Sequence, residues 1–222
     1  MVYEVKVPKC FLKIKKLKSD LEKKLYITRK AVFQLDYYMC NAVFIENDID
    51  DNVCFILDLR NLKQLVKGQT KLLKENIILK IELDENKNYG IVSLVGKDTG
   101  FIRAEKQTEY PDIEIVFDNE SLNKLTPITQ DFLKIREFNK SVRPEIIIRD
   151  DIMRVMLGDY KILECEYNTE DDDNEKKKIF KLNPETFCIT FDDNEEFLFY
   201  TKFEKVFCKQ GDKLFVCVAQ FS

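Results

Sequence analysis

The sequence predicts an α+β fold of two similar domains, each with two helices packed on antiparallel sheets. Stretches with apolar residues at helical spacing alternate with short runs rich in Val, Ile, Phe and Tyr. The order helix, strands, helix, strands occurs twice, although the two halves do not share sequence. The length of 222 residues fits two domains. We place them at residues 1–106 and 119–222, with a connector at 107–118.

The first predicted helix spans Pro8 to Leu25, where apolar residues recur at helical spacing. Basic residues lie off this apolar stripe: Lys13, Lys15, Lys16, Lys23 and Lys24. Without further context, an ordinary solvated helix face explains these lysines better than a binding surface does. Strands are predicted next at Leu25 to Leu35 and at Asn41 to Glu46, which are rich in β-branched and aromatic residues.

The stretch from Val53 to Leu94 has the clearest pattern. A strand at Val53 to Leu57 leads to Asp58, which is placed to cap a helix by accepting hydrogen bonds from the first free amides. At 100° per residue, one arc of this helix is apolar (Leu59, Leu62, Leu65 and Val66), a second is basic (Arg60, Lys63 and Lys67), and Gly68 is a plausible end. The sequence therefore predicts a helix with a basic stripe lying across a sheet.

A hairpin is predicted at Ile77 to Leu83 and Tyr89 to Val95, followed by a strand at Gly100 to Ala104. From Glu105 to Asp118 apolar residues alternate with acidic ones: Ile113, Ile115 and Phe117 are the apolar members. Because Pro111 cannot donate a ladder hydrogen bond, we expect an extended connector there. The alternation fits the inward face of a strand equally well.

The second half begins with a predicted helix at Ile128 to Asn139, capped by Thr129, with Lys134 and Arg136 off its apolar face. A second helix is predicted near Pro184 to Phe191, because Asn183 can cap it and proline is favoured at the first helical position. Strands are predicted at Glu145 to Ile148, Ile152 to Leu157, Lys161 to Tyr167, Ile179 to Leu182, Glu196 to Tyr200, Lys202 to Cys208 and Leu214 to Ala219.

The charge balance argues against a globally basic nucleic-acid binder. Lys and Arg number 36 against 40 Asp and Glu, which gives a net charge of −4. Any attraction to nucleic acid must therefore come from local segregation of charge. With only six glycines, the chain has no glycine-rich phosphate loop.

Catalytic and metal-binding equipment is also missing from the sequence. No histidine is present, which removes the usual general base and the commonest zinc ligand. None of the seven cysteines forms a CxxC pair, so we expect buried free thiols in an intracellular, reducing compartment. The run Asp171 to Asp173 lies in a polar stretch typical of a solvated loop. We therefore predict no enzyme, no metal, no cofactor and, without an apolar run of 18 residues or a signal peptide, no membrane segment.

Three passages carry a resemblance to a known family: Leu25 to Ile45, Phe55 to Val95 and Phe180 to Ala219. Together with the duplicated order of elements, they resemble the DNA sliding clamps, particularly the two-domain clamps of T4-type bacteriophages and, more distantly, proliferating cell nuclear antigen. The resemblance implies a viral, phage-encoded processivity factor in the host cytoplasm. It implies a homotrimeric ring that encircles duplex DNA without reading its sequence, with a DNA polymerase and a clamp loader as partners.

The resemblance also implies two sets of site residues. The basic residues of the inner helices would contact DNA: Lys13, Lys15, Lys16, Lys23, Arg60, Lys63, Lys67, Lys134 and Arg136. A short terminal peptide of the polymerase would insert between the two domains, beneath the connector, against Met39, Cys40, Ile113, Ile115, Phe117, Val218, Ala219 and Phe221. One segment departs from the family pattern, because Asn183 to Asp192 contains no basic residue.

Two other functions remain open from the sequence. The chain fits a non-enzymatic viral or phage protein-interaction module of two α+β domains with no role on DNA, whose lysines are simply solvated. A nucleic-acid enzyme using Mg²⁺ held by carboxylates is the third possibility, although no carboxylate constellation supports it. The mass in solution separates the clamp from the interaction module. A trimer favours the clamp, and a monomer that binds another protein tightly favours the interaction module.

Overall fold

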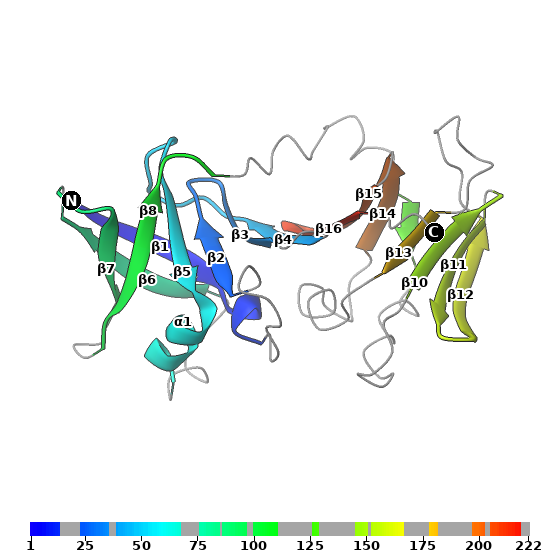
Figure 1. The fold of residues 1–222 in the computed structure, drawn as a ribbon, viewed down its shortest axis with the longest axis horizontal. Coiled ribbons are helices and arrows are strands. Elements are labelled where there is room, and N and C mark those ends of the chain that lie inside the picture. Colours follow the sequence, from blue (N-terminus) through cyan, green and yellow to red (C-terminus); the bar gives the residue numbers. More distant parts are fainter. Residues whose placement is uncertain are drawn as a thin grey trace. The chain divides into compact units, whose positions relative to one another are not determined.

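The computed structural model describes residues 1–13, 23–35, 39–67, 76–84, 86–96, 100–110, 126–128, 145–150, 152–166, 178–181, 197–202 and 205–218. The chain forms two compact units. The first comprises Met1–Asp36 and Ala42–Pro111, and the second comprises Tyr37–Asn41 and Asp112–Ser222. Each is described by itself below, and Figure 1 labels their elements.

The first unit is built on an antiparallel sheet. Its strands are β1 (Val2–Pro8), β2 (Lys24–Ile27), β3 (Ala31–Leu35), β5 (Cys54–Asp58), β6 (Asn76–Leu83), β7 (Tyr89–Leu94), β8 (Ile102–Gln107) and the part of β4 (Met39–Phe44) from Ala42 onward. They follow the order β1-β6-β7-β8-β5-β2-β3-β4. One α-helix, α1 (Leu59–Leu65), and one 3-10 helix, η1 (Lys9–Lys13), accompany this sheet in the described residues. The two helices contact each other at one end of the unit (Figure 1).

The prediction of a first helix from Pro8 to Leu25 is wrong at both ends. Val2–Pro8 is strand β1, in which exposed and buried residues alternate and which pairs with β6 from Val2↔Glu82 to Pro8↔Asn76. At the other end, Lys24–Ile27 forms strand β2. Leu25 is fully buried there, since it lies in the centre of the sheet, opposite Leu57. Only Lys9–Lys13 is helical in the described part, as a 3-10 turn, and residues 14–22 lie outside it.

The predicted strand from Leu25 to Leu35 is two strands, β2 and β3, joined by a tight turn. Thr28 makes that turn, because its backbone amide donates to the Ala31 carbonyl at 2.9 Å and the Ala31 amide donates to the Thr28 hydroxyl at 3.2 Å. A threonine hydroxyl competes in this way with ladder hydrogen bonds and favours a turn. The predicted hairpin after the central helix is confirmed as β6 and β7.

The core of the first unit is aliphatic and aromatic. Leu25, Ile27, Phe55 and Leu57 are fully buried on β2 and β5. The ring of Tyr3 on β1 meets that of Phe55 with centroids 5.3 Å apart, so two strands that are not neighbours in the sheet order pack against each other. Burial of such large side chains is the main source of stability for a unit of this size.

Asn47, in the loop after β4, joins parts of the first unit that are distant in sequence. Its side chain is 4% exposed. The side-chain carbonyl accepts the backbone amide of Lys6 on β1 at 2.7 Å, and the side-chain amide donates to the Thr28 carbonyl in the β2–β3 turn at 3.1 Å. The Asn47 backbone amide also donates to the Arg29 carbonyl at 2.6 Å. One buried amide thus fixes the edge strand β1 to a distant part of the sheet.

The second unit contains two strand groups. β14 (Phe197–Lys202), β15 (Lys205–Gln210), β16 (Lys213–Val218) and β9 (Thr126–Ile128) follow the order β16-β15-β14-β9. β10 (Glu145–Arg149), β11 (Ile152–Leu157), β12 (Tyr160–Glu166) and β13 (Lys178–Lys181) follow the order β12-β11-β10-β13. Each predicted strand of this half has a counterpart among them.

The predicted start of the second-half helix is wrong at Ile128. This residue ends strand β9 and pairs with Phe197 of β14, in keeping with the preference of β-branched residues for strands. The rest of that helix, through Asn139, and the predicted helix at Pro184 to Phe191 lie outside the described residues. Two helices per domain are therefore not confirmed, and the described residues are mostly strand.

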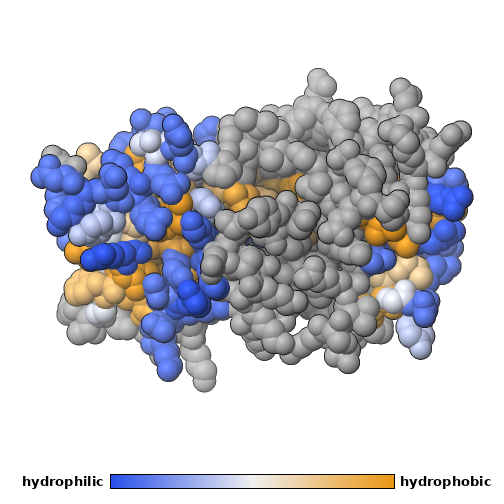
Figure 2. Space-filling model, viewed as in Figure 1, coloured by the Kyte–Doolittle hydropathy of each residue, from blue (hydrophilic) through white to orange (hydrophobic). Residues whose placement is uncertain are grey.

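Hydrophilic and hydrophobic residues are interspersed on the described surface (Figure 2). Among the described residues the exposed large hydrophobic side chains belong to Met1, Val2, Ile78, Ile91, Val95, Phe101 and Tyr160. No helix in the described part of the chain has the length and apolar character needed to cross a membrane.

Candidate nucleic-acid interface

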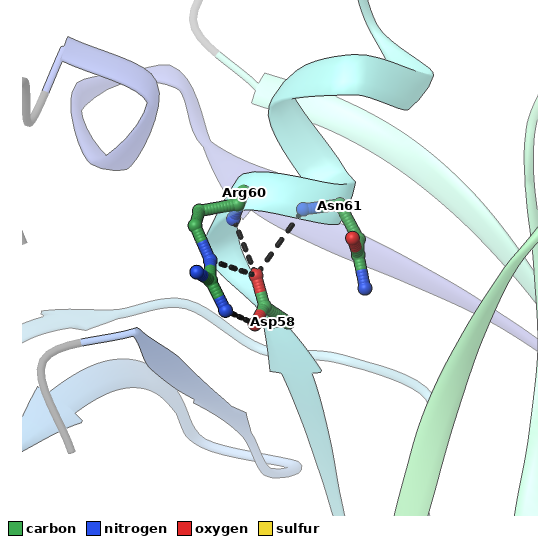
Figure 3. A network of polar contacts seen from close by, with 3 residues as sticks. All are labelled: Asp58, Arg60 and Asn61. Carbon is green, nitrogen blue, oxygen red and sulfur yellow. Dashed lines mark hydrogen bonds and ion pairs between the residues drawn. The ribbon is translucent and has the colours of Figure 1, made fainter. Parts of the chain in front are cut away.

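Helix α1 begins where strand β5 ends, as the sequence predicts. Asp58 keeps an extended backbone (φ −76°, ψ 120°), and its side chain accepts hydrogen bonds from the amides of Arg60 at 2.7 Å and Asn61 at 3.2 Å (Figure 3). These amides have no partner within the helix, so the carboxylate satisfies them and fixes the first turn. The helix ends at Leu65, earlier than Gly68, with Val66 as its C-cap.

The apolar arc of α1 faces the core. Leu59 and Leu62 are fully buried, Leu65 is nearly so, and α1 contacts η1, β5 and β8. On the remaining surface of the helix, Arg60 is exposed and Lys63 is half-buried, and Lys67 is exposed just after the helix end. The predicted basic stripe is therefore accessible, and it is held by a helix whose other side is fixed to the sheet.

Arg60 does not present a free charge. Its Nη2 lies 3.0 Å from Asp58 Oδ2 and its Nε lies 3.4 Å from Oδ1, so the guanidinium lies against the carboxylate that caps its own helix (Figure 3). Burial by itself would raise the pKa of Asp58. The hydrogen bonds from the Arg60 side chain and from the amides of Arg60 and Asn61, with the Arg60 charge, outweigh burial and hold the pKa below its ordinary value.

The other two basic residues of the stripe differ in their surroundings. Burial lowers the pKa of Lys63, because its ammonium loses part of its hydration beside the helix. Lys67 lies in the exposed turn after the helix. Three cations predicted as equivalent are therefore an ion-paired guanidinium, a partly desolvated ammonium and an exposed ammonium.

Two lysines at the start of β2, Lys23 just before the strand and Lys24 in it, lie near the start of α1. The carbonyl of Lys23 accepts the amide of Leu59 at 2.8 Å, so its backbone is adjacent to the helix start. Lys24 lies opposite Asp58 in the β2–β5 ladder. Lys24 was predicted to lie on the first helix and was not among the predicted DNA contacts. The predicted strand began at Leu25, and the observed strand β2 begins one residue earlier, at Lys24.

The remaining predicted DNA contacts are only partly described. Lys13 ends η1, and its side chain is not described. Lys15, Lys16, Lys134 and Arg136 lie outside the described residues. The structure thus brings together Lys23, Arg60, Lys63 and Lys67 in one region of the first unit.

The predicted partner-binding residues stay a prediction. Met39 and Cys40 begin β4, and Cys40 is buried with 8% of its surface exposed. Val218 ends β16. The other five, Ile113, Ile115, Phe117, Ala219 and Phe221, lie outside the described residues. Within the described residues no cluster of acidic or cysteine side chains could hold a metal ion.

Comparisons with known proteins identify the fold. No family model and no curated protein match the chain. Among solved structures, a DNA polymerase sliding clamp from Bacillus subtilis superposes with a TM-score of 0.63 at 13% identity, over 100% of this chain and 66% of the clamp chain. A putative DNA polymerase III beta subunit from Eubacterium rectale gives a TM-score of 0.62 at 14% identity, over 99% of this chain and 66% of that one. The Thermotoga maritima beta subunit gives 0.57 at 12% identity, over 99% and 66%.

This chain spans 66% of the length of each of these three clamp chains. The likeness extends over nearly the whole of the present chain and includes both units. At 14% identity or less it establishes the fold alone. The chain therefore has the fold of the DNA polymerase sliding clamps.

Proposed function

We propose that this chain is a DNA sliding clamp, a non-enzymatic processivity factor that encircles duplex DNA and tethers a DNA polymerase. The observation that carries the proposal is the likeness to sliding clamps over 99–100% of this chain, including both units. The accessible basic residues of α1 support it independently, because they place positive charge on one helix face of an acidic protein.

The charge distribution suits contacts that hold DNA without fixing its position. Phosphate contacts carry no sequence information, and each contributes a salt-dependent increment to affinity. Lys63 and Lys67 supply such contacts from α1, with Arg60 beside them. The net charge of −4 keeps the rest of the protein from attracting DNA to other surfaces. A clamp needs this combination, since it must follow the duplex and never bind one sequence tightly.

We further propose a homotrimer, with domain limits at residues 1–106 and 119–222 and a connector at 107–118. A closed ring of six such domains requires three copies of a two-domain chain. Strand β12 ends its sheet order and has one partner, β11, among the described strands. An unpaired strand edge favours pairing with another chain, so β12 is suited to joining a neighbouring copy. A clamp loader and a polymerase would then be the partners of the ring.

Two measurements test the proposal. Light scattering should give a mass near three times 26.3 kDa at high protein concentration. The protein should also co-elute with nicked circular plasmid in gel filtration and be released when the plasmid is linearised, because a ring is held by topology rather than by affinity. A monomer that shows no difference between circular and linear DNA would favour the protein-interaction module instead.

Charge reversal links the DNA result to α1. The variant Arg60→Glu, Lys63→Glu, Lys67→Glu should lose retention on circular DNA while keeping its mass. Its matched control reverses Lys6 on β1, Lys80 on β6 and Lys87 in the β6–β7 turn, for the same change in net charge. Equal loss in both triple variants would show that only total charge matters and would remove α1 from the proposed interface.

A further inference from the structure

The carboxylate of Asp58 performs two tasks at the start of α1. It accepts the amides of Arg60 and Asn61, and it holds the Arg60 guanidinium through both of its oxygens. Capping needs only an acceptor oxygen at this position, and asparagine caps helices about as well as aspartate. The negative charge is therefore not required to start the helix, and its specific effect falls on Arg60.

We propose that Asp58 sets how strongly α1 holds a phosphate backbone, by keeping the Arg60 guanidinium engaged at the helix start. This inference rests on the proposed function. It names a residue that tunes the DNA affinity of the clamp downward, although Asp58 itself does not contact DNA. Because of this ion pair, Arg60 would bind a phosphate only after its guanidinium leaves the Asp58 carboxylate.

The geometry supports this competition. A guanidinium binds a carboxylate and a phosphate through the same planar set of N–H donors, so the two anions compete for the same atoms. The Arg60 side chain is 60% exposed and that of Asp58 is 31% exposed. A phosphate can therefore approach the guanidinium from solvent, while the carboxylate stays anchored by the two helix amides. The anchored anion has the advantage, because it is fixed in place before DNA arrives.

The neighbouring charges do not replace Asp58 in this role. Lys24 lies opposite Asp58 in the β2–β5 ladder, and Lys23 adjoins the start of α1 through its backbone. Both are cations, so removal of the carboxylate charge leaves Arg60, Lys23 and Lys24 as the charged groups that the described residues place at the start of the helix. Attraction of this region to a polyanion should then rise, and most of the rise should depend on Arg60.

The test compares Asp58→Asn with a matched control, Asp84→Asn. Asp84 lies in the turn after β6, where it accepts the Asn86 amide at 3.2 Å and pairs with Lys87 at 2.9 Å, so both substitutions remove one charge from a capping, ion-paired aspartate. Binding of a fluorescent 30-base-pair linear duplex would be measured between 50 and 200 mM salt. One released cation adds about 0.9 to the salt slope, so the affinity gain of Asp58→Asn should shrink about 3.5-fold over that range.

The double variant Asp58→Asn, Arg60→Gln isolates the mechanism. The gain from Asp58→Asn should be largely lost when Arg60 is already glutamine, and Asp84→Asn should give no comparable gain. Circular dichroism should be unchanged in all variants, since the side-chain amide introduced by Asp58→Asn keeps the acceptor oxygen of the cap.

Each outcome bears on the inference separately from the clamp proposal. Two results would overturn the inference and leave the clamp proposal standing. One is measurable DNA binding with equal affinity for Asp58→Asn and Asp84→Asn. The other is a gain in DNA affinity from Asp58→Asn that persists when Arg60 is replaced by glutamine. Absence of binding to the linear duplex by both wild-type and Asp58→Asn protein, even at 20 mM salt, overturns the inference alone, because the clamp proposal is tested by retention on circular DNA.

Discussion

Replacement of Asn47 by alanine should destabilise the first unit by about 2–4 kcal/mol, because two hydrogen bonds are lost and their partners are left without them. The side chain is 4% exposed and bridges the Lys6 amide, at 2.7 Å, and the Thr28 carbonyl, at 3.1 Å. Each bond contributes about 1 kcal/mol net, and each orphaned partner costs about 1 kcal/mol or more where water cannot reach it.

Urea unfolding followed by circular dichroism would measure this loss. The control is Asn52→Ala, an exposed asparagine nearby in the same loop, which should change stability by less than about 0.5 kcal/mol. A loss below about 1 kcal/mol for Asn47→Ala, with an unchanged denaturant slope, would refute the argument that this amide ties β1 to the β2–β3 turn.

Asn47→Asp adds a test with a defined sign in pH. The new carboxylate keeps an acceptor for the Lys6 amide but loses the donor to the Thr28 carbonyl, so two oxygens face each other at neutral pH. Its pKa in the folded protein should therefore rise above the unfolded value, since the protonated form restores a donor. Stability relative to wild type should recover as the pH falls through the raised folded pKa towards the unfolded value, and it should be lowest above the folded pKa. A deficit that is independent of pH would count against the bridging geometry.

Two further predictions concern the β6–β7 hairpin and three of the cysteines. Gly90→Ala should lower the free energy of unfolding, measured by heat or urea, by about 1–3 kcal/mol. A Cβ at this position would lie 2.7 Å from Ile81 Cγ2 and 3.3 Å from the Glu82 carbonyl oxygen. A variant as stable as wild type would show that the hairpin relaxes to accommodate the methyl group. Burial raises the pKa of the Cys40 and Cys54 thiols to about 12. In the native protein at pH 8, iodoacetamide should therefore modify the half-buried Cys10 faster than either of them. Mass spectrometry of peptides would measure the three rates. Equal rates at all three cysteines would contradict the buried strand positions.

Local signals predicted the elements whose partners are close in sequence. The cap at Asp58 and the hairpin of β6 and β7 follow from a helix-start pattern and from alternation around a polar turn, and both are confirmed. Strands β10 and β11 are adjacent in sequence and in the sheet, and their predicted limits lie within a residue of those observed. In each of these elements the residues that decide the structure lie within one window of the sequence.

The features that the sequence did not reveal depend on distant partners. Strand β1 was not predicted, although Tyr3, Val5 and Val7 alternate with polar residues, and its partner, β6, lies far along the chain. Asn47 is one of several polar residues in its loop, and only its buried position distinguishes it. Arg60 was predicted as a free cation, since helical periodicity places it on the basic arc and says nothing of a side chain that folds back to the cap.

The pairing of β1 with β6 has a consequence for synthesis of the protein. Val2 pairs with Glu82, so β1 leaves the ribosome some 80 residues before its partner, roughly 4–16 s at ordinary elongation rates. During that interval its alternating apolar residues, Tyr3, Val5 and Val7, are exposed on an unpaired strand. Non-local pairing of this kind makes folding slow, so the first unit should complete its sheet late and depend on chaperones until β6 emerges.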